Sequence, residues 1–155
     1  MSKLGKKPVE RKDLGDNPYI ACMKLVARKR LSRVLGKDNE TVERKYLLEV
    51  QPCTKIWHDV DYRNVINSID DVMAFKLFIH IVYTLNKDFV CINPTFCISK
   101  YNLRSRRNFD DAIKVLLKRA IITPTIVKDI YWVNPAMMFS GNRLDEYPDN
   151  IVEVK

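Results

Sequence analysis

The clearest pattern of apolar and polar positions in this sequence predicts a helix followed at once by a β-hairpin. Apolar side chains recur at steps of three and four over residues 109–120, with charged side chains opposite, which indicates an amphipathic helix with one buried face. Residues 121–127 and 130–133 are rich in β-branched and aromatic side chains and are separated by two residues. We interpret them as a hairpin in which Val127 faces Ile130.

Shorter segments before this helix predict the rest of the same unit. Residues 72–85 are almost entirely apolar and predict a central core helix, and residues 89–92 predict a short strand. Asn93 and Pro94 are typical of a helix start, and Asn102 can end that two-turn helix in the left-handed conformation. The order helix, strand, helix, turn, helix, hairpin is typical of a winged helix-turn-helix domain, with residues 89–92 as a third strand.

The N-terminal half predicts a basic helix and an additional hairpin. Residues 17–36 contain an apolar stripe, a helix-start signal at Asp16 or Asn17 and a cluster of cations. These cations either contact the phosphates of a nucleic acid or form an ordinary solvated face. Residues 43–50 and 55–60 predict the extra β-hairpin. The cations of the predicted helix are Lys24, Arg28, Lys29, Arg30 and Arg33.

Charge and composition divide the chain further. The sequence is 46% hydrophobic with a net charge of +8, and residues 1–37 hold eleven Lys and Arg against three acids. A basic N-terminus indicates a polyanionic partner, with a solubilising tail as the alternative. We therefore expect an α+β protein with four parts. They are a flexible basic arm over 1–15, a basic helix plus β-hairpin over 16–67, a winged helix-turn-helix domain over 68–143 and an acidic tail over 144–155.

The sequence contains no motif that indicates a membrane segment, a metal site or an enzyme. No apolar run is long enough to cross a bilayer, and no apolar segment follows the basic N-terminus, so we expect a protein that works inside a cell. The four cysteines show no tight ligand spacing, which favours reduced packed thiols over a zinc site assembled from distant positions. Glycine-rich phosphate loops and nucleophile elbows are absent, so neither catalysis nor a cofactor is expected.

Several motifs between residues 68 and 143 occur together in one known family. The most specific is Tyr131-Trp132-Val133-Asn134-Pro135, followed by Phe139 and Gly141-Asn142-Arg143, and Ser105-Arg106-Arg107 leads into the helix before it. This half of the chain resembles the winged-helix domain of small plasmid and phage replication-initiation proteins of the plasmid replication protein L type. The resemblance implies DNA binding through the helix before the wing. It maps that contact onto Arg104, Ser105, Arg106, Arg107 and Lys114.

Two functions follow from these patterns. The first is binding of double-stranded DNA in replication initiation or regulation of a plasmid or phage, in the cytoplasm of the bacterial host. The candidate DNA-binding residues are Arg104, Ser105, Arg106, Arg107, Lys114, Lys128, Lys24, Arg28, Lys29 and Arg33. The second is a structural subunit of a phage virion, such as a connector or tail-ring component, in which a winged helix makes protein contacts and the chain forms a homo-oligomer or part of a larger assembly. The second is favoured by the acids Asp110 and Asp111 on the predicted reading helix and by the short wing.

Overall fold

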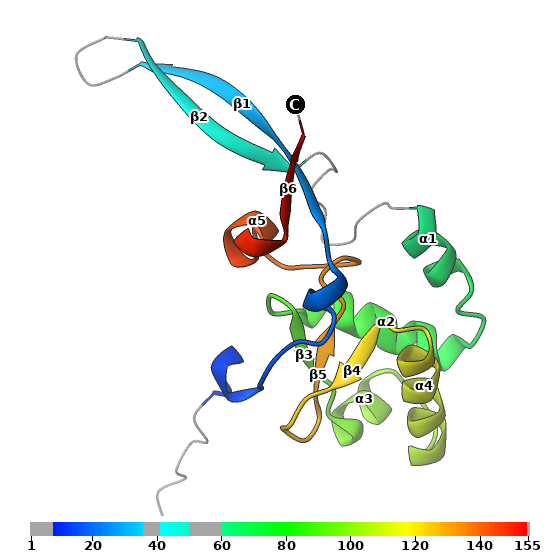
Figure 1. The fold of residues 1–155 in the computed structure, drawn as a ribbon. Coiled ribbons are helices and arrows are strands. Elements are labelled where there is room, and N and C mark those ends of the chain that lie inside the picture. The colour runs from blue at the N-terminus through cyan, green and yellow to red at the C-terminus, as the bar shows by residue number, and fades with distance from the viewer. Residues whose placement is uncertain (1–7, 36–40, 50–59, 155) are drawn as a thin grey trace, which may run out of the picture.

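The chain has an α+β fold with two small sheets (Figure 1). The computed structural model describes residues 8–35, 41–49 and 60–154. Three helices and one sheet form a helical body, and the second sheet extends from that body as a long antiparallel ribbon (Figure 1). The architecture therefore separates a body with buried faces from a projecting segment.

The helical body contains the elements predicted between residues 72 and 133, in the predicted order. Three antiparallel strands form its sheet in the order β3-β5-β4, so that β3 is the third strand beside the hairpin. Asn93 caps α3, and Asn102 after it has a left-handed φ of 52°. The elements are α2 (Val72–Thr84), β3 (Phe89–Cys91), α3 (Pro94–Lys100), α4 (Arg106–Lys118), β4 (Ile122–Pro124) and β5 (Ile130–Val133).

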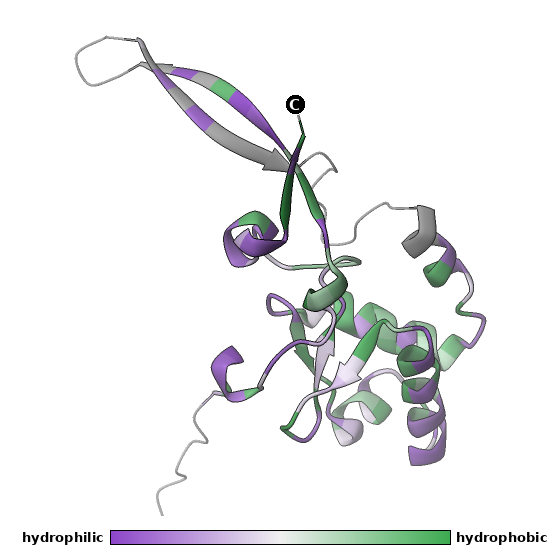
Figure 2. Ribbon diagram, in the orientation of Figure 1, coloured by the Kyte–Doolittle hydropathy of each residue, from purple (hydrophilic) through white to green (hydrophobic). Residues whose placement is uncertain are grey.

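The main core lies where α2 and α4 pack against each other and against one face of this sheet. Leu77 and Ile81 of α2, Leu116 of α4 and Val133 of β5 are all fully buried in one cluster. In Figure 2 the outer side of α4 is hydrophilic, in agreement with its amphipathic sequence. His80 of α2 is also buried, where its two ring nitrogens hydrogen-bond Tyr101 Oη and the Cys91 carbonyl.

The N-terminal segment covers the other face of the sheet. Leu14 is 1% exposed and packs with Phe89, Ile130 and Trp132, which is also 1% exposed. Short 3-10 turns flank this contact, namely η1 (Arg11–Asp13) and η2 (Ile20–Cys22). The prediction of a flexible arm over 1–15 is therefore wrong from Arg11 onward, and residues 1–7 lie outside the described residues. The sequence of the arm has no apolar period because a single leucine provides its contact.

A buried carboxylate joins three distant parts of the chain. Asp88 is fully buried and accepts hydrogen bonds from Arg11 Nε and Nη2, both at 2.9 Å, from Asn17 Nδ2 at 2.9 Å and from Tyr147 Oη at 2.6 Å. Burial alone would raise the pKa of Asp88, but hydrogen bonds from Arg11, Tyr147 and Asn17 outweigh it and lower that pKa. The N-terminal segment, the start of β3 and the C-terminal segment are thus held by one charged group.

The second sheet is built around a long hairpin. It consists of β1 (Leu25–Leu35), β2 (Thr41–Glu49) and β6 (Ile151–Val154), in the order β2-β1-β6. The β1 and β2 strands are antiparallel, whereas β6 pairs in parallel with the first residues of β1. Leu25 and Ala27 are buried against Phe139 and Leu144, close to α5 (Arg143–Glu146) and η3 (Pro148–Asn150). The base of the ribbon is therefore anchored to the body.

The helix predicted over residues 17–36 is wrong, because residues 25–35 form strand β1. Burial alternates at the start of this strand, with Leu25 and Ala27 buried and Val26 and Arg28 exposed. Ala, Leu, Lys and Arg favour helices intrinsically. Here pairing with β2 on one side and β6 on the other overrides that local preference.

The predicted hairpin over residues 43–60 lies only partly within the described residues. Residues 41–49 form strand β2, and the strand that pairs with it among the described residues is β1. Residues 55–59 of the predicted second strand lie outside the described residues, and Val60 is the first residue of a helix, α1 (Val60–Asn67). A strand chooses its partner through contacts remote in sequence, which a local pattern does not contain.

The hairpin at residues 121–133 is confirmed, but its predicted register is wrong by two residues. Pro124 pairs with Tyr131 and Ile122 with Val133, so residues 125–129 form a five-residue loop. A two-residue turn at Lys128 and Asp129 would favour positive φ at both. Only Asp129 adopts it, with a φ of 63°.

Gly141 precedes the cap of α5 in a backbone conformation that favours glycine. Its φ is +132°, and an added Cβ would lie 3.2 Å from Cε1 of Phe139. We expect Gly141→Ala to destabilise the fold by about 1–3 kcal/mol, measured by urea unfolding. Gly15→Ala is the control, because Gly15 has a φ of +82° and no heavy atom within 4 Å of the added Cβ. A loss no larger than that of the control would contradict a steric role for Phe139.

Candidate nucleic-acid interface

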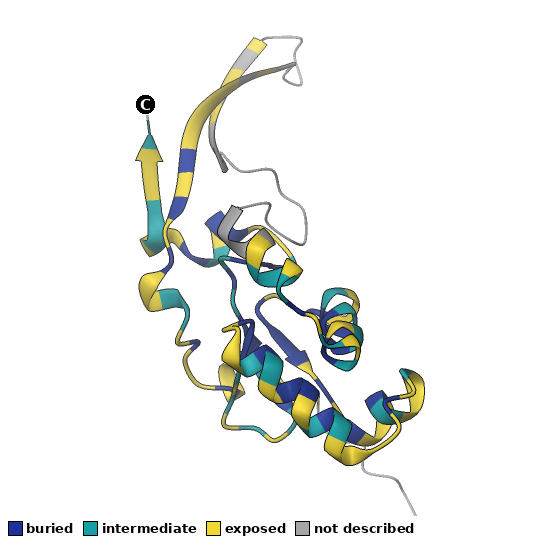
Figure 3. Cartoon of the chain, turned by 90° about the vertical axis from the view of Figure 1, so that its right-hand side faces the viewer, coloured by how far each residue is buried: buried dark blue, intermediate teal, exposed yellow. Residues whose placement is uncertain are grey.

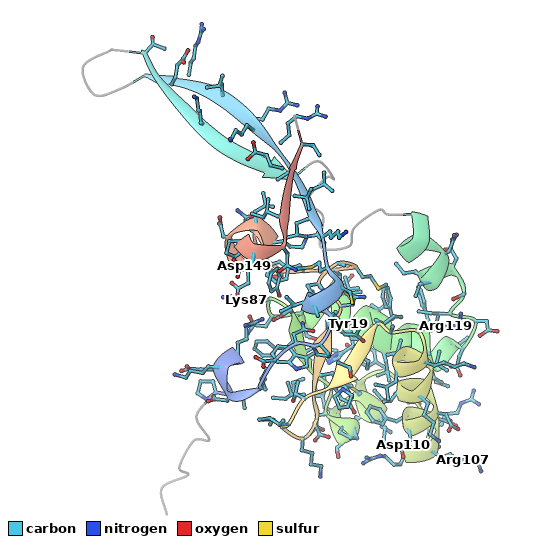
Figure 4. The ribbon with its side chains drawn as sticks, in the orientation of Figure 1. Tyr19, Lys87, Arg107, Asp110, Arg119 and Asp149 are labelled. Atoms are coloured by element: carbon cyan, nitrogen blue, oxygen red, sulfur yellow. The ribbon has the colours of Figure 1, made fainter. Side chains whose placement is uncertain are left out.

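The amino-terminal end of α4 presents arginines at the surface. Ser105 caps the helix by accepting a hydrogen bond from the Asn108 amide at 3.2 Å, and Arg104 before it has a left-handed φ of 68°. Both residues are exposed, as are the two arginines that follow. Figure 4 shows Arg107 and Asp110 at this free end of α4, with no other described segment over them. This part of the predicted site therefore remains accessible.

Acidic side chains on the same helix partly neutralise this edge. Arg106 Nε lies 3.0 Å from Asp110 Oδ1, and Arg107 Nε lies 4.0 Å from Asp111 Oδ2. The arginine side chains are nevertheless 63% and 91% exposed, respectively. Exposed pairs at this spacing contribute only about 0.3–0.5 kcal/mol each. A phosphate group can therefore replace these carboxylates as the partner of the arginines at small cost.

Lys114 belongs to the same edge and shares the second carboxylate. Its Nζ lies 3.5 Å from Asp111 Oδ1, and its side chain is 75% exposed. Among the side chains that the structure describes, Arg104 at the start of this edge has no ion-pair partner. The edge is thus cationic overall, with its least compensated charge at the helix start.

The β4–β5 loop lies beside this end of the helix. Tyr131 at the base of the loop is half-buried, and burial first, then the charge of Asp129, raises its pKa, whereas Arg106 acts in the opposite direction. In Figure 1 this loop and the first turn of α4 lie at the same end of the body. Lys128 and Ile126 are exposed in the loop, Ile126 to 81%. The structure therefore brings Lys128 and the α4 arginines to one end of the body.

The remaining predicted cations lie on a separate surface. Lys24 and Arg28 lie at the base of the ribbon, and Lys29 and Arg33 farther along β1. Lys29 pairs with Glu153 at 2.9 Å and Arg33 with Glu43 at 3.4 Å. The ribbon leaves the body at the end opposite α3 and the free end of α4 (Figure 1). The ten predicted residues therefore form two surfaces rather than one.

Among the side chains that the structure describes on the ribbon, two further cations were not among the predicted site residues. Arg30 and Lys45 are exposed, on β1 and β2 respectively. A helical interpretation spaces cations by multiples of three and four, whereas pairing of the strands brings residues from both halves of the hairpin together. Lys45 lies opposite Leu31 in the pairing of β1 with β2. Knowledge of this register would have identified Lys45 as part of the ribbon surface.

Comparisons with known proteins leave the function to be argued from this geometry. No family model, curated protein or solved structure gives a significant match to the chain.

Within the described ranges, no helix is long and apolar enough to span a bilayer. No group of three His, Cys, Asp or Glu side chains among the same residues could hold a metal ion. Cys22 and Cys91 are exposed free thiols and Cys97 is a buried one.

Proposed function

We propose that this protein binds double-stranded DNA through a winged helix-turn-helix domain, in which α4 is the recognition helix and the β4–β5 loop is a short wing. The observation that carries the proposal is the exposed cationic start of α4, at the same end of the body as that loop (Figure 1). An α-helix fits the major groove, and in helix-turn-helix proteins the first residues of the second helix reach the base edges. The order of elements and the sheet order β3-β5-β4 also support it.

The side chains have distinct roles in this proposal. Arg104 and Arg107 bind phosphates or the acceptor atoms of guanine, since arginine forms paired hydrogen bonds with both. Arg106 and Lys114 keep their carboxylate partners until a phosphate replaces them. Ser105 holds the helix start in place. The resemblance of residues 68–143 to replication-initiation proteins supports initiation or regulation of replication in a plasmid or phage, in the bacterial cytoplasm.

Fluorescence anisotropy with a labelled duplex at two salt concentrations tests this function. We expect affinity to fall with salt by about one log unit per log of salt for each phosphate contact. The double variant Arg104→Ala with Arg107→Ala should lose at least tenfold in affinity and reduce that slope by about two. The control removes two exposed lysines that lie outside α4, Lys12→Ala with Lys87→Gln, and should change affinity less than threefold. Absence of binding at low salt, or equal losses in both variants, would refute the proposal.

A structural subunit of a phage virion is the second candidate. It is favoured by the ribbon, which extends from the body with Leu31 62% exposed and with strand edges that no other described strand covers. In this case the ribbon contacts a neighbouring copy, and the chain occurs in the virion. Light scattering over a range of protein concentrations distinguishes the two functions, because a ring component assembles without DNA.

A further inference from the structure

The ribbon becomes a free two-stranded arm beyond its base. Pairing between β1 and β6 ends at Arg28 and Val154, whereas pairing between β1 and β2 continues to Leu35 and Thr41. All side chains described beyond Ala27 on these two strands are exposed, as Figure 3 shows by the change from buried to exposed residues along the arm. Residues 29–35 span about 23 Å as an extended strand. The arm therefore has length and accessibility to contact a partner away from the body.

The described side chains of the arm are mainly cationic. Five of them carry a positive charge, Glu43 carries the single negative charge and Leu31 is the one large apolar group. Arg28, Arg30 and Lys45 form no ion pair with any described side chain. The cations are Arg28, Lys29, Arg30, Arg33 and Lys45. Exposed cations without a carboxylate partner among the described side chains favour a polyanion, because each can neutralise a phosphate group.

The shape of the arm also fits a nucleic-acid duplex. Two antiparallel strands lie about 4.8 Å apart, and a two-stranded ribbon enters the major groove, which is about 12 Å wide. The arm and the start of α4 lie at opposite ends of the molecule (Figure 1). A straight duplex bound at one of these two protein surfaces therefore points away from the other surface.

We propose that the β1–β2 ribbon is a second duplex-binding surface, so that one chain holds two separate DNA segments and bridges them. This inference rests on the proposed function for the α4 end. In this proposal the ribbon is the weaker of the two surfaces, because the base-edge contacts are assigned to α4. A bivalent chain raises the local concentration of the second segment once the first is bound.

A two-duplex capture assay tests the bridge. One duplex is immobilised, the protein is added, and capture of a second, fluorescent duplex is measured at low salt. We expect Arg28→Thr with Arg30→Thr to reduce capture at least tenfold while its affinity for a single duplex changes less than threefold. Threonine suits a strand. The control Lys12→Ala with Lys87→Gln removes the same charge outside α4 and the ribbon and should capture normally, and circular dichroism checks that each variant is folded.

The α4 variant separates this bridge from bridging by a dimer. Arg104→Ala with Arg107→Ala should still bind one duplex per chain through the ribbon, with at least tenfold lower affinity, and wild type should bind two. A dimer joined by protein contacts would instead lose all binding in the α4 variant and keep capture in the ribbon variant, which would overturn the inference.

The remaining outcomes are equally decisive. Single-duplex binding by wild type without capture would overturn the bridge and leave the proposed function standing, whereas no binding at all would overturn both. Capture that persists in the ribbon variant, together with a loss of self-association in light scattering, would assign the ribbon to a protein partner and refute the inference.

Discussion

Asp88→Ala is expected to destabilise the folded protein by about 3–5 kcal/mol, because it leaves buried donors without an acceptor. Tyr147 and Asn17 are 4% and 5% exposed, so water cannot replace the lost carboxylate, and Arg11 loses both of its hydrogen bonds. The measurement is the urea midpoint at constant slope. The N-terminal segment should also become more accessible to protease, since the carboxylate holds it to the body.

The control for this change is Asp149→Ala. Asp149 is exposed and lies near Lys87 in the view of Figure 4, with no hydrogen bond or ion pair to a described residue. Its removal should change stability by no more than about 0.5 kcal/mol. Equal losses in the two variants would show that the buried carboxylate does not connect these segments.

The same carboxylate gives stability a defined dependence on pH. Its pKa in the folded state is lowered, so ionisation of Asp88 stabilises the fold above the unfolded pKa of about 3.9. That contribution is lost as the pH falls through the lower folded pKa. In Asp88→Asn this component should be absent, and urea midpoints between pH 7 and pH 3 should fall less steeply than in wild type. Parallel pH profiles would contradict the assignment.

Leu14→Ala is expected to cost about 2–5 kcal/mol, a large effect for a residue in an N-terminal arm. Leu14 is 1% exposed and fills the space over Trp132, and its truncation leaves a cavity there. Acrylamide quenching of Trp132 fluorescence should increase, measured in a Trp57→Phe background so that one tryptophan reports. Urea unfolding gives the stability change.

Val9→Ala is the matched control within the same arm. Val9 is 39% exposed, so its truncation should cost under about 1 kcal/mol and leave quenching unchanged. If the two variants behave alike, the arm does not form part of the core.

The helical body could be predicted from the sequence because its signals are local. The apolar period of α4 and the caps at Asn93 and Ser105 are each contained within a few residues. The register of the hairpin could not be predicted, since Thr125 extends the loop by hydrogen-bonding with its hydroxyl to the backbone of Val127. Hydrogen bonds from a side chain to the backbone, such as this one, compete with formation of a two-residue turn.

The ribbon and the Asp88 cluster could not be predicted, because their partners are distant in sequence. Arg11 and Asp88 are separated by 77 residues, and Tyr147 and Asp88 by 59. The lysines, arginines and leucines of residues 24–35 are compatible with either a helix or a strand. Pairing with β2 and β6, which the local pattern does not contain, determines that these residues form a strand. At α4 the candidate residues are consecutive in sequence, so they lie together at the surface as a local pattern implies. Arg28 and Arg33 lie on strand β1 and not on the predicted helix.

The parallel pairing of β6 with β1 links synthesis to folding. Leu25 leaves the ribosome more than 120 residues before Ile151, its partner. Because synthesis proceeds at about 5–20 residues per second, β6 becomes available to the base of the ribbon about 6–25 s after Leu25 is made. During that interval Leu25 and Ala27 lack the later residues that bury them, and the edge of β1 that β6 will cover is open to pairing with other strands.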